Sequence, residues 1–252
     1  MGNRIYYKYL DLDGAIKSLF NLTLKYSSPQ CVNDPTEFFV SGFQDITEAD
    51  APKIFNYFNK KDGNIYGGFR FEGNVNNKEN LVQELNELRK QLFAKYSFLS
   101  LSHSNNNLSM WNLYADKHSG VVIGYDEEAF QMLFDVKYTQ FPPLIKHNCV
   151  LNEREREEQL INILTTKSID WKNEQEARDI LCMDWKDPRR KFYENGLLTT
   201  SARFIKEIYF GIYCSEKTRK QIRQICNQRH IQCSFFEIVL DYQNYTSIKP
   251  IK

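Results

Sequence analysis

Residues 109–126 (SMWNLYADKHSGVVIGYD) constrain the fold of this chain more than any other stretch. Between Met110 and Ala115, bulky apolar and polar residues follow one another at a spacing that suits one or two helical turns. Residues 118–120 end that turn, and the apolar run 121–125 is typical of a short buried strand. The segment therefore predicts a helix that turns directly into a core strand. The aromatic and charged side chains at this corner fit core packing or the wall of a ligand cleft, and the segment alone leaves both open.

The same periodicities, followed along the chain, predict an alternation of strands and helices. Strands are expected at residues 4–9, 23–27, 98–102, 121–125, 134–138, 177–183, 206–213 and 233–240. Helices are expected at residues 13–22, 47–58, 78–96, 110–115, 127–133, 153–166 and 215–228. The prediction is one α+β domain spanning residues 1–252, with a mixed, mostly antiparallel sheet and flanking helices.

The overall charge and hydropathy narrow the function classes. The formal net charge is +1, so no field of the whole molecule steers the chain toward nucleic acid or an anionic membrane. The start, MGNRIYYKYL, has no apolar signal region, and no stretch approaches the roughly 18 apolar residues of a membrane span. We therefore expect a cytoplasmic protein with no membrane contact.

Metal sites and dithiol redox centres are disfavoured by the spacing of the ligand-type residues, and a disulfide framework is disfavoured because the chain is long and lacks a secretory segment. The six cysteines contain no CxxC pair, and the four histidines share no metal-ligand spacing. The chain also lacks a glycine-rich phosphate loop, HExxH, GxSxG and a calcium loop. No metal is expected, and weaker patterns have to carry the functional argument.

The first of these patterns is the pair Glu174 and Glu176 at the start of a predicted strand. Carboxylates at i and i+2 of a strand project to the same side. Two neighbouring carboxylates hold different pKa values and can share acid, base or cation-stabilising work. The alternative is a solvated strand entry in which these carboxylates pair with Arg178 or Lys172.

The second pattern is the turn at residues 27–37, SSPQCVNDPTE. Its Asn-Asp-Pro core holds a rigid turn whose side chains and amides suit a ligand hydroxyl or phosphate, and the alternative is a structural Asx turn. Lys8, in a predicted strand, faces either solvent or a cleft. Basic residues at 217–229 suit a phosphate backbone or a solvated helix face. His118 fits a helix-end cap or a titrating group, and Trp111 and Tyr114 fit the core.

Taken together and in order, these segments resemble the bacterial family known as domain of unknown function twenty-nine seventy-one. The resemblance rests on YKY at 7–9, the turn at 27–37, residues 100–126, VKY at 136–138, SIDWKNEQEAR at 168–178 and IKEIYFGIY at 205–213. The chain departs from the family pattern at Cys31 and Val32, where an aromatic residue is usual, and in the variable stretch 141–160.

The layout also resembles the ADP-ribosyltransferase fold, which implies nicotinamide adenine dinucleotide (NAD) as a substrate. By that resemblance, Glu176 stabilises the cation formed at the ribose and Glu174 orients the acceptor nucleophile. The implied NAD-binding residues are Lys8, Ser27, Asn33, Trp111, Tyr114 and His118. Lys8 stands where that fold usually has Arg or His, so its phosphate contact is the least typical of the set.

The resemblance further implies a toxin or phage-defence effector that transfers ADP-ribose to a macromolecular acceptor or hydrolyses NAD. An antitoxin or defence-system partner would fit that role. Two other functions remain open, namely a non-catalytic module that senses a nucleotide or partner protein and a nucleic-acid-processing effector. The first interpretation makes a geometric prediction: Trp111 or Tyr114, Asn33 and Glu176 should converge on one pocket.

Overall fold

The structure is a computed structural model of the 252-residue chain. It describes residues 4–44, 47–50, 52, 79–80, 82–83, 86, 93–145, 153–183 and 187–251.

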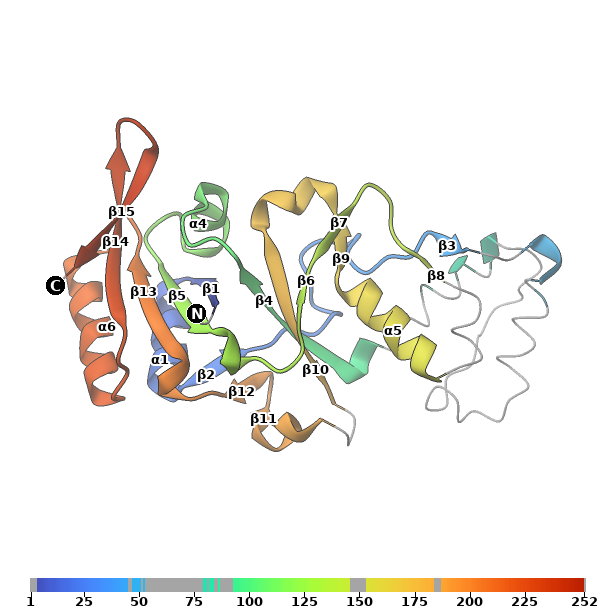
Figure 1. Cartoon of the computed structure of the whole chain (residues 1–252), viewed down its shortest axis with the longest axis horizontal. Coiled ribbons are helices and arrows are strands. Elements are labelled where there is room, and N and C mark those ends of the chain that lie inside the picture. The colour runs from blue at the N-terminus through green and yellow to red at the C-terminus, as the bar shows by residue number, and fades with distance from the viewer. Residues whose placement is uncertain are drawn as a thin grey trace.

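An eight-stranded sheet runs through the middle of the molecule (Figure 1). In spatial order its strands are β15 (Tyr245–Ile251), β14 (Ser234–Asp241), β13 (Ile205–Phe210), β5 (Val121–Asp126), β1 (Ile5–Leu10), β4 (Tyr96–Ser102), β10 (Glu176–Cys182) and β6 (Leu133–Asp135). Every neighbouring pair is antiparallel except β13 and β14, which run parallel. The predicted α+β class with a mixed, mostly antiparallel sheet is therefore confirmed.

In the described part of the chain, three smaller sheets accompany it. One contains β11 (Tyr193–Glu194), β12 (Leu197–Thr199) and β2 (Thr23–Lys25). The other two are parallel pairs, β3 (Gly42–Phe43) with β8 (Leu144–Ile145) and β7 (Lys137–Thr139) with β9 (Thr166–Ser168). The α-helices whose bounds are defined are α1 (Leu12–Asn21), α4 (Leu108–Tyr114), α5 (Glu153–Leu164) and α6 (Glu216–Gln228). Among the described residues, no helix is long and apolar enough to cross a membrane.

Side chains of the central strands alternate between two hydrophobic clusters, one on each face of the sheet. From β5, Val121, Ile123 and Tyr125 join the cluster that contains residues of α1 and α6. Val122 points the other way and joins Trp111 of α4 in a second cluster. A third cluster lies between α5, β4 and β10. Figure 1 shows α1 and α6 beside the β13–β15 end of the sheet, with α5 far from them near the other end. This arrangement explains why β5 is apolar at nearly every position.

The corner between α4 and β5 forms as the sequence predicts. The side chain of Asn107 caps α4 by accepting a hydrogen bond from the Met110 N–H at 3.2 Å. At the turn into β5, a Cβ atom on Gly120 would lie 2.3 Å from the carbonyl oxygen of Leu10. Only glycine allows the backbone to approach β1 this closely.

Several expected elements differ from the observed ones. Residues 127–133 form a 3₁₀ turn (Glu127–Ala129) and the start of β6 instead of a helix, and Phe130 between them packs against Tyr6 of β1 and Tyr125 of β5. The expected helices at 47–58 and 78–96 lie mostly outside the described residues. Of their described residues, Pro52 in the first and residues 79–80, 82–83 and 86 in the second are α-helical, as expected. Glu48–Asp50 and Phe93–Lys95 are 3₁₀ turns, and Tyr96 already begins β4. The strand β15 was not expected, because residues 245–251 contain Lys249 and Pro250, which are typical of an exposed sheet edge.

Candidate functional site

The sheet opens between β1 and β4, and this split creates the candidate site. The two strands pair only at Tyr7 and Ser102. Further along β4, the backbone of Phe98 pairs instead with Ser27, which follows β2. The carbonyl oxygen of Ser100 lies between these two pairings and accepts a hydrogen bond from Lys8 Nζ at 2.8 Å. Lys8 therefore reaches into the split and satisfies a backbone acceptor that the sheet leaves without a strand partner.

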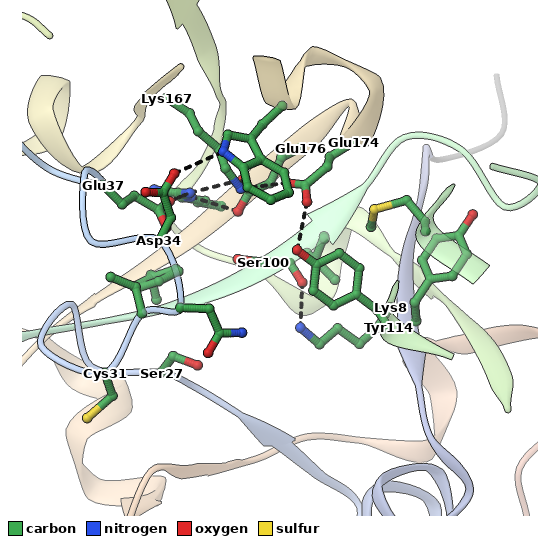
Figure 2. Close-up of a pocket in the computed structure, with 18 of the residues that line it drawn as sticks. Lys8, Ser27, Cys31, Asp34, Glu37, Ser100, Tyr114, Lys167, Glu174 and Glu176 are labelled. Carbon is green, nitrogen blue, oxygen red and sulfur yellow. Dashed lines mark hydrogen bonds and ion pairs between the residues drawn. The ribbon is translucent and has the colours of Figure 1, made fainter. Parts of the chain in front are cut away.

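A cavity of about 530 Å³ lies over this split, a size in the range of small-molecule sites. Figure 2 shows its walls, which come from β1, the turn at 27–37, β4, α4, β9 and the start of β10. Six of the residues predicted as site residues line it: Lys8, Ser27, Asn33, Tyr114, Glu174 and Glu176. The predicted convergence of Tyr114, Asn33 and Glu176 on one pocket is therefore observed, although these residues come from three distant parts of the sequence.

One wall of the cavity is a continuous network of charged hydrogen bonds. Lys167 of β9 donates from its ammonium to Glu174 Oε2 at 2.5 Å and to Glu176 Oε2 at 3.1 Å. Glu174 Oε1 also accepts the hydroxyl of Tyr114 at 2.7 Å. Lys167 thus ties together the two carboxylates that the sequence pattern singled out.

Arg178 extends this network into the interior. Its Nε donates to Glu176 Oε1 at 2.7 Å, and one terminal nitrogen donates to Glu176 Oε2 at 2.9 Å and to Glu37. The other terminal nitrogen donates to the carbonyl of Leu164 at 2.8 Å. The guanidinium also lies over the ring of Phe98, with 4.9 Å to the ring centroid. Arg178 does pair with a glutamate, as the alternative interpretation expected, but the pair is buried and not solvated.

The charges around Glu176 decide its protonation. Burial by itself raises the pKa of this carboxyl, but Arg178 and then Lys167 outweigh burial and lower the pKa to about 2. The same carboxylates act on Lys167, whose pKa burial would lower but Glu176, Glu37 and Glu174 raise. Both groups are therefore charged across the physiological pH range.

This pKa makes the stability of the fold sensitive to acid. Glu176 has a pKa of about 2 in the folded chain against an ordinary value of 4.5, so its contribution is present above pH 4.5 and lost as the pH falls toward 2. The difference corresponds to about 3 kcal/mol of unfolding free energy. Urea titrations between pH 6 and pH 2.5 should show this loss in the wild type and a smaller loss in Glu176→Gln. Equal losses in both proteins would contradict the assignment.

Lys8 lies at the opposite side of the cavity, and its pKa is lowered whereas that of Lys167 is raised. Burial lowers its pKa from 10.5 to about 8, although the negative charge of Glu176 opposes the shift. Among the described residues, Lys8 makes no ion pair with a carboxylate, and its one hydrogen bond goes to a backbone carbonyl. It is therefore still protonated in most molecules at neutral pH, with donors to spare.

Two neighbouring residues of the turn at 27–37, Asp34 and Asn33, have different roles. Asp34 Oδ1 accepts hydrogen bonds from the backbone and hydroxyl of Thr36 at 2.8 and 2.7 Å, as in a structural Asx turn. Its Oδ2 accepts the indole N–H of Trp171 at 2.9 Å, which links the turn to the segment before β10. Asn33 is exposed and lines the cavity. The structural interpretation thus holds for Asp34 and leaves Asn33 available to a ligand.

Two predicted site residues lie outside the cavity. Trp111 is a fully buried residue of α4. Its ring packs edge-on against Tyr9, and its indole N–H donates to the carbonyl of Asn105 at 3.0 Å. His118 lies in the turn after α4, where its ring contacts Tyr213 and its carbonyl oxygen accepts the Tyr213 N–H at 3.0 Å. Trp111 is thus a core residue, and His118 shapes the turn. Tyr114 is the aromatic residue of α4 that reaches the cavity.

The local structure around the glutamate pair also differs from the expected strand. Glu174 is the last residue of a 3₁₀ turn (Ile169–Glu174), and Gln175 has a left-handed φ of 47° before β10 begins at Glu176. The two carboxylates still lie close together, because Lys167 binds both. Their proximity therefore comes from a turn and a shared cation, and not from the period of a strand.

The sequence did not single out Lys167, Glu37 and Trp171 as site residues. They complete the wall that carries the charged network, which we call the acidic wall. Lys167 stands beside SIDWKNEQEAR in the sequence, so its closeness to the motif was one available signal. Glu37 ends the Asn-Asp-Pro turn, but only the tertiary fold brings it to Arg178. Nothing local in the sequence indicates that contact.

The basic helix α6 is occupied by contacts within the fold. Arg219 donates to Glu237 Oε2 at 2.6 Å and lies over the ring of Phe210. Arg223 lies over Phe235, and Arg229 lies over Phe20. These contacts favour the structural interpretation of residues 217–229 over a phosphate-binding surface.

Within the described residues, no group of three or more His, Cys, Asp or Glu side chains is arranged to hold a metal ion.

Comparisons with known proteins add one family match. No curated protein and no solved structure matches the chain. Residues 110–178, which run from α4 through Lys167 and both glutamates to Arg178, match the family model described as Protein of unknown function (DUF2971). This segment of the chain is therefore similar to that family, whose description states no activity.

Proposed function

We propose that the cavity binds NAD and cleaves its bond between nicotinamide and ribose. The observation that carries the proposal is the convergence of Lys8, Ser27, Asn33, Tyr114 and the two glutamates on one cavity of about 530 Å³. A first-strand cation, a polar turn after the second strand and a late glutamate pair are the parts that the ADP-ribosyltransferase resemblance implies.

The chemistry follows from the charges on the acidic wall. When the C1′–N bond breaks, its electron pair goes to nicotinamide and positive charge develops on the ribose ring. Glu176 is ionised and held in one orientation, so it stabilises that charge without reorganising. Water or a macromolecular nucleophile then adds to C1′ and loses its proton to solvent. Glu174, whose Oε1 accepts the hydroxyl of Tyr114, orients this nucleophile in the proposed reaction.

The test is the release of nicotinamide from labelled NAD by the purified chain. We expect release above the rate in buffer, with hydrolysis or transfer to a macromolecule distinguished by where the ribose label goes. Absence of both release and binding would overturn the proposal. A positive result would fit a toxin or phage-defence effector, whose activity an antitoxin or defence-system partner would need to restrain.

Tyr114→Phe tests one contact of the wall with little disturbance. The change removes only the hydroxyl that donates to Glu174 Oε1 at 2.7 Å, and Tyr114 is 38% exposed. Because a hydrogen bond to a charged group contributes on the order of 1 kcal/mol at a partly exposed site, we expect kcat/KM to fall about fivefold. Initial rates of nicotinamide release measure this. Tyr213→Phe, at an exposed tyrosine outside the cavity, should leave the rate unchanged, and equal rates for all three proteins would exclude a role for Tyr114.

A specific observation favours a second candidate, a non-catalytic module that senses a nucleotide. Both glutamates are already hydrogen-bonded to buried cations, as in a purely structural ion network. This candidate predicts thermal stabilisation by NAD without release of nicotinamide. The same assay, run beside a thermal shift, separates the two functions.

A further inference from the structure

The polar groups that line the cavity are divided unequally between its two sides. The acidic wall holds four carboxylates, those of Asp34, Glu37, Glu174 and Glu176, with Lys167 and Arg178 shared among three of them. Figure 2 shows Lys8 and Ser27 on the other side of Ser100 from this network. The cavity is therefore negative along one wall and positive at one point.

A count of side-chain donors shows what this positive point can bind. The donors of most polar lining residues are already engaged by protein acceptors. Tyr7 donates to Glu207, Tyr9 to the carbonyl of Ser104, Tyr114 to Glu174, Trp171 to Asp34 and Ser100 to Glu176. Lys167 and Arg178 serve the carboxylates of the acidic wall.

Three lining residues keep strong donors for a ligand. The ammonium of Lys8 has three N–H groups, of which Ser100 takes one. Within the described part of the chain, neither the hydroxyl of Ser27 nor the amide of Asn33 has a side-chain hydrogen bond, and both residues are exposed. These donors suit the oxygens of one phosphate group, which lysine binds as a point charge.

Among the described side chains that line the cavity, a second phosphate finds no comparable partner. The remaining charged side chains of the lining are carboxylates and cations that carboxylates already surround. A phosphate there would meet like charges at short range in a poorly solvated site, which is unfavourable. A cationic or uncharged ring suits that wall instead.

From this division we infer that the cavity recognises a mononucleotide, with one phosphate at Lys8, Ser27 and Asn33 and its base toward the acidic wall. The inference rests on the proposed function and makes its substrate more specific. The cavity contacts only the nicotinamide mononucleotide half of NAD, and the second phosphate and the adenosine extend into solvent.

The test compares the binding of nicotinamide riboside, nicotinamide mononucleotide and NAD by calorimetry at pH 7, in chains that carry Glu176→Gln so that cleavage is slow during the measurement. We expect the mononucleotide to bind at least about tenfold tighter than the riboside, because a hydrogen bond to a charged group contributes that much. NAD should bind within about threefold of the mononucleotide, since its second half adds no contact of comparable strength. Lys8→Met should bring the ratio between mononucleotide and riboside close to one, while the exposed Lys220→Met on α6 should leave the ratio unchanged.

Two outcomes overturn the inference. NAD binding more than tenfold tighter than the mononucleotide would show that the second half is recognised, and the proposed function would still stand. A tenfold ratio that survives in Lys8→Met would remove Lys8 from the phosphate site. Because Lys8 is partly buried, the exposed Asn33→Ala provides a second variant, which should lower mononucleotide affinity without changing riboside affinity. If none of the three compounds binds and no nicotinamide is released, the proposed function itself fails.

Discussion

Replacing Arg178 with methionine is expected to lower the free energy of unfolding by about 3–5 kcal/mol, the cost of breaking a buried ion pair from one side. Arg178 is 1% exposed, and its guanidinium is the main partner of Glu176 and also binds Glu37. Methionine fills a similar volume but donates nothing. Glu37 and the carbonyl of Leu164 would then lose the donation of Arg178, and Glu176 would keep Lys167 but lose its main partner.

Urea denaturation at pH 7, followed by circular dichroism, measures this loss. Arg190→Met is the matched control, because Arg190 is exposed, and a change there should stay within about 0.5 kcal/mol. The deficit of Arg178→Met should also shrink as the pH falls toward 4, since carboxylates without a cation take up protons more readily when buried. A deficit near that of the control would mean that the network contributes little to stability.

The sequence predicted best those features that depend on neighbouring residues. The helix-to-strand corner at 109–126 is correct because the Asn107 cap, the apolar run and Gly120 are all local signals. Most expected strands exist for the same reason, since alternating burial shows directly in the residue pattern. The six cavity residues came from the resemblance of the layout to the ADP-ribosyltransferase fold.

The sequence could not predict features that depend on the register between distant strands. The split between β1 and β4 arises because β4 pairs with Tyr7 at one point and with Ser27 at another, and no local pattern encodes that exchange. The split in turn decides that Lys8 points into a cavity. Trp111 was predicted to face the cavity and lies in the core instead. An aromatic residue on a helix gives the same sequence pattern whether it faces a ligand or the core.

The ion pairs of Glu174 and Glu176 limit the catalytic roles that these residues can have. A general base needs a pKa near the working pH, and the pKa of Glu176, about 2, is far below it. A carboxylate that only stabilises a developing cation has the opposite requirement, because it has to stay ionised. The network around Glu176 therefore suits electrostatic stabilisation and disfavours proton abstraction by this residue.

Glu176→Gln is accordingly expected to lower kcat for nicotinamide release by about 10²–10³-fold, the range found when one preorganised electrostatic partner of a transition state is removed. The amide keeps an oxygen for Arg178 Nε, but its NH₂ group, in the place of Oε2, faces donors of both Lys167 and Arg178, so some stability is lost as well. Rates should therefore be measured well below the midpoint of thermal unfolding. Binding of nicotinamide mononucleotide should change by less than about threefold, because the lost charge acts mainly on the cation formed during reaction.

Asp170→Asn is the matched control for this variant. It neutralises an exposed carboxylate in the 3₁₀ turn that leads to Glu174, and it lies outside the cavity. Its kcat should equal that of the wild type. If Glu176→Gln folds, binds the nucleotide and releases nicotinamide as fast as this control, then Glu176 supports the fold alone. The cavity would then be a nucleotide-binding site whose reaction, if it has one, depends on another residue.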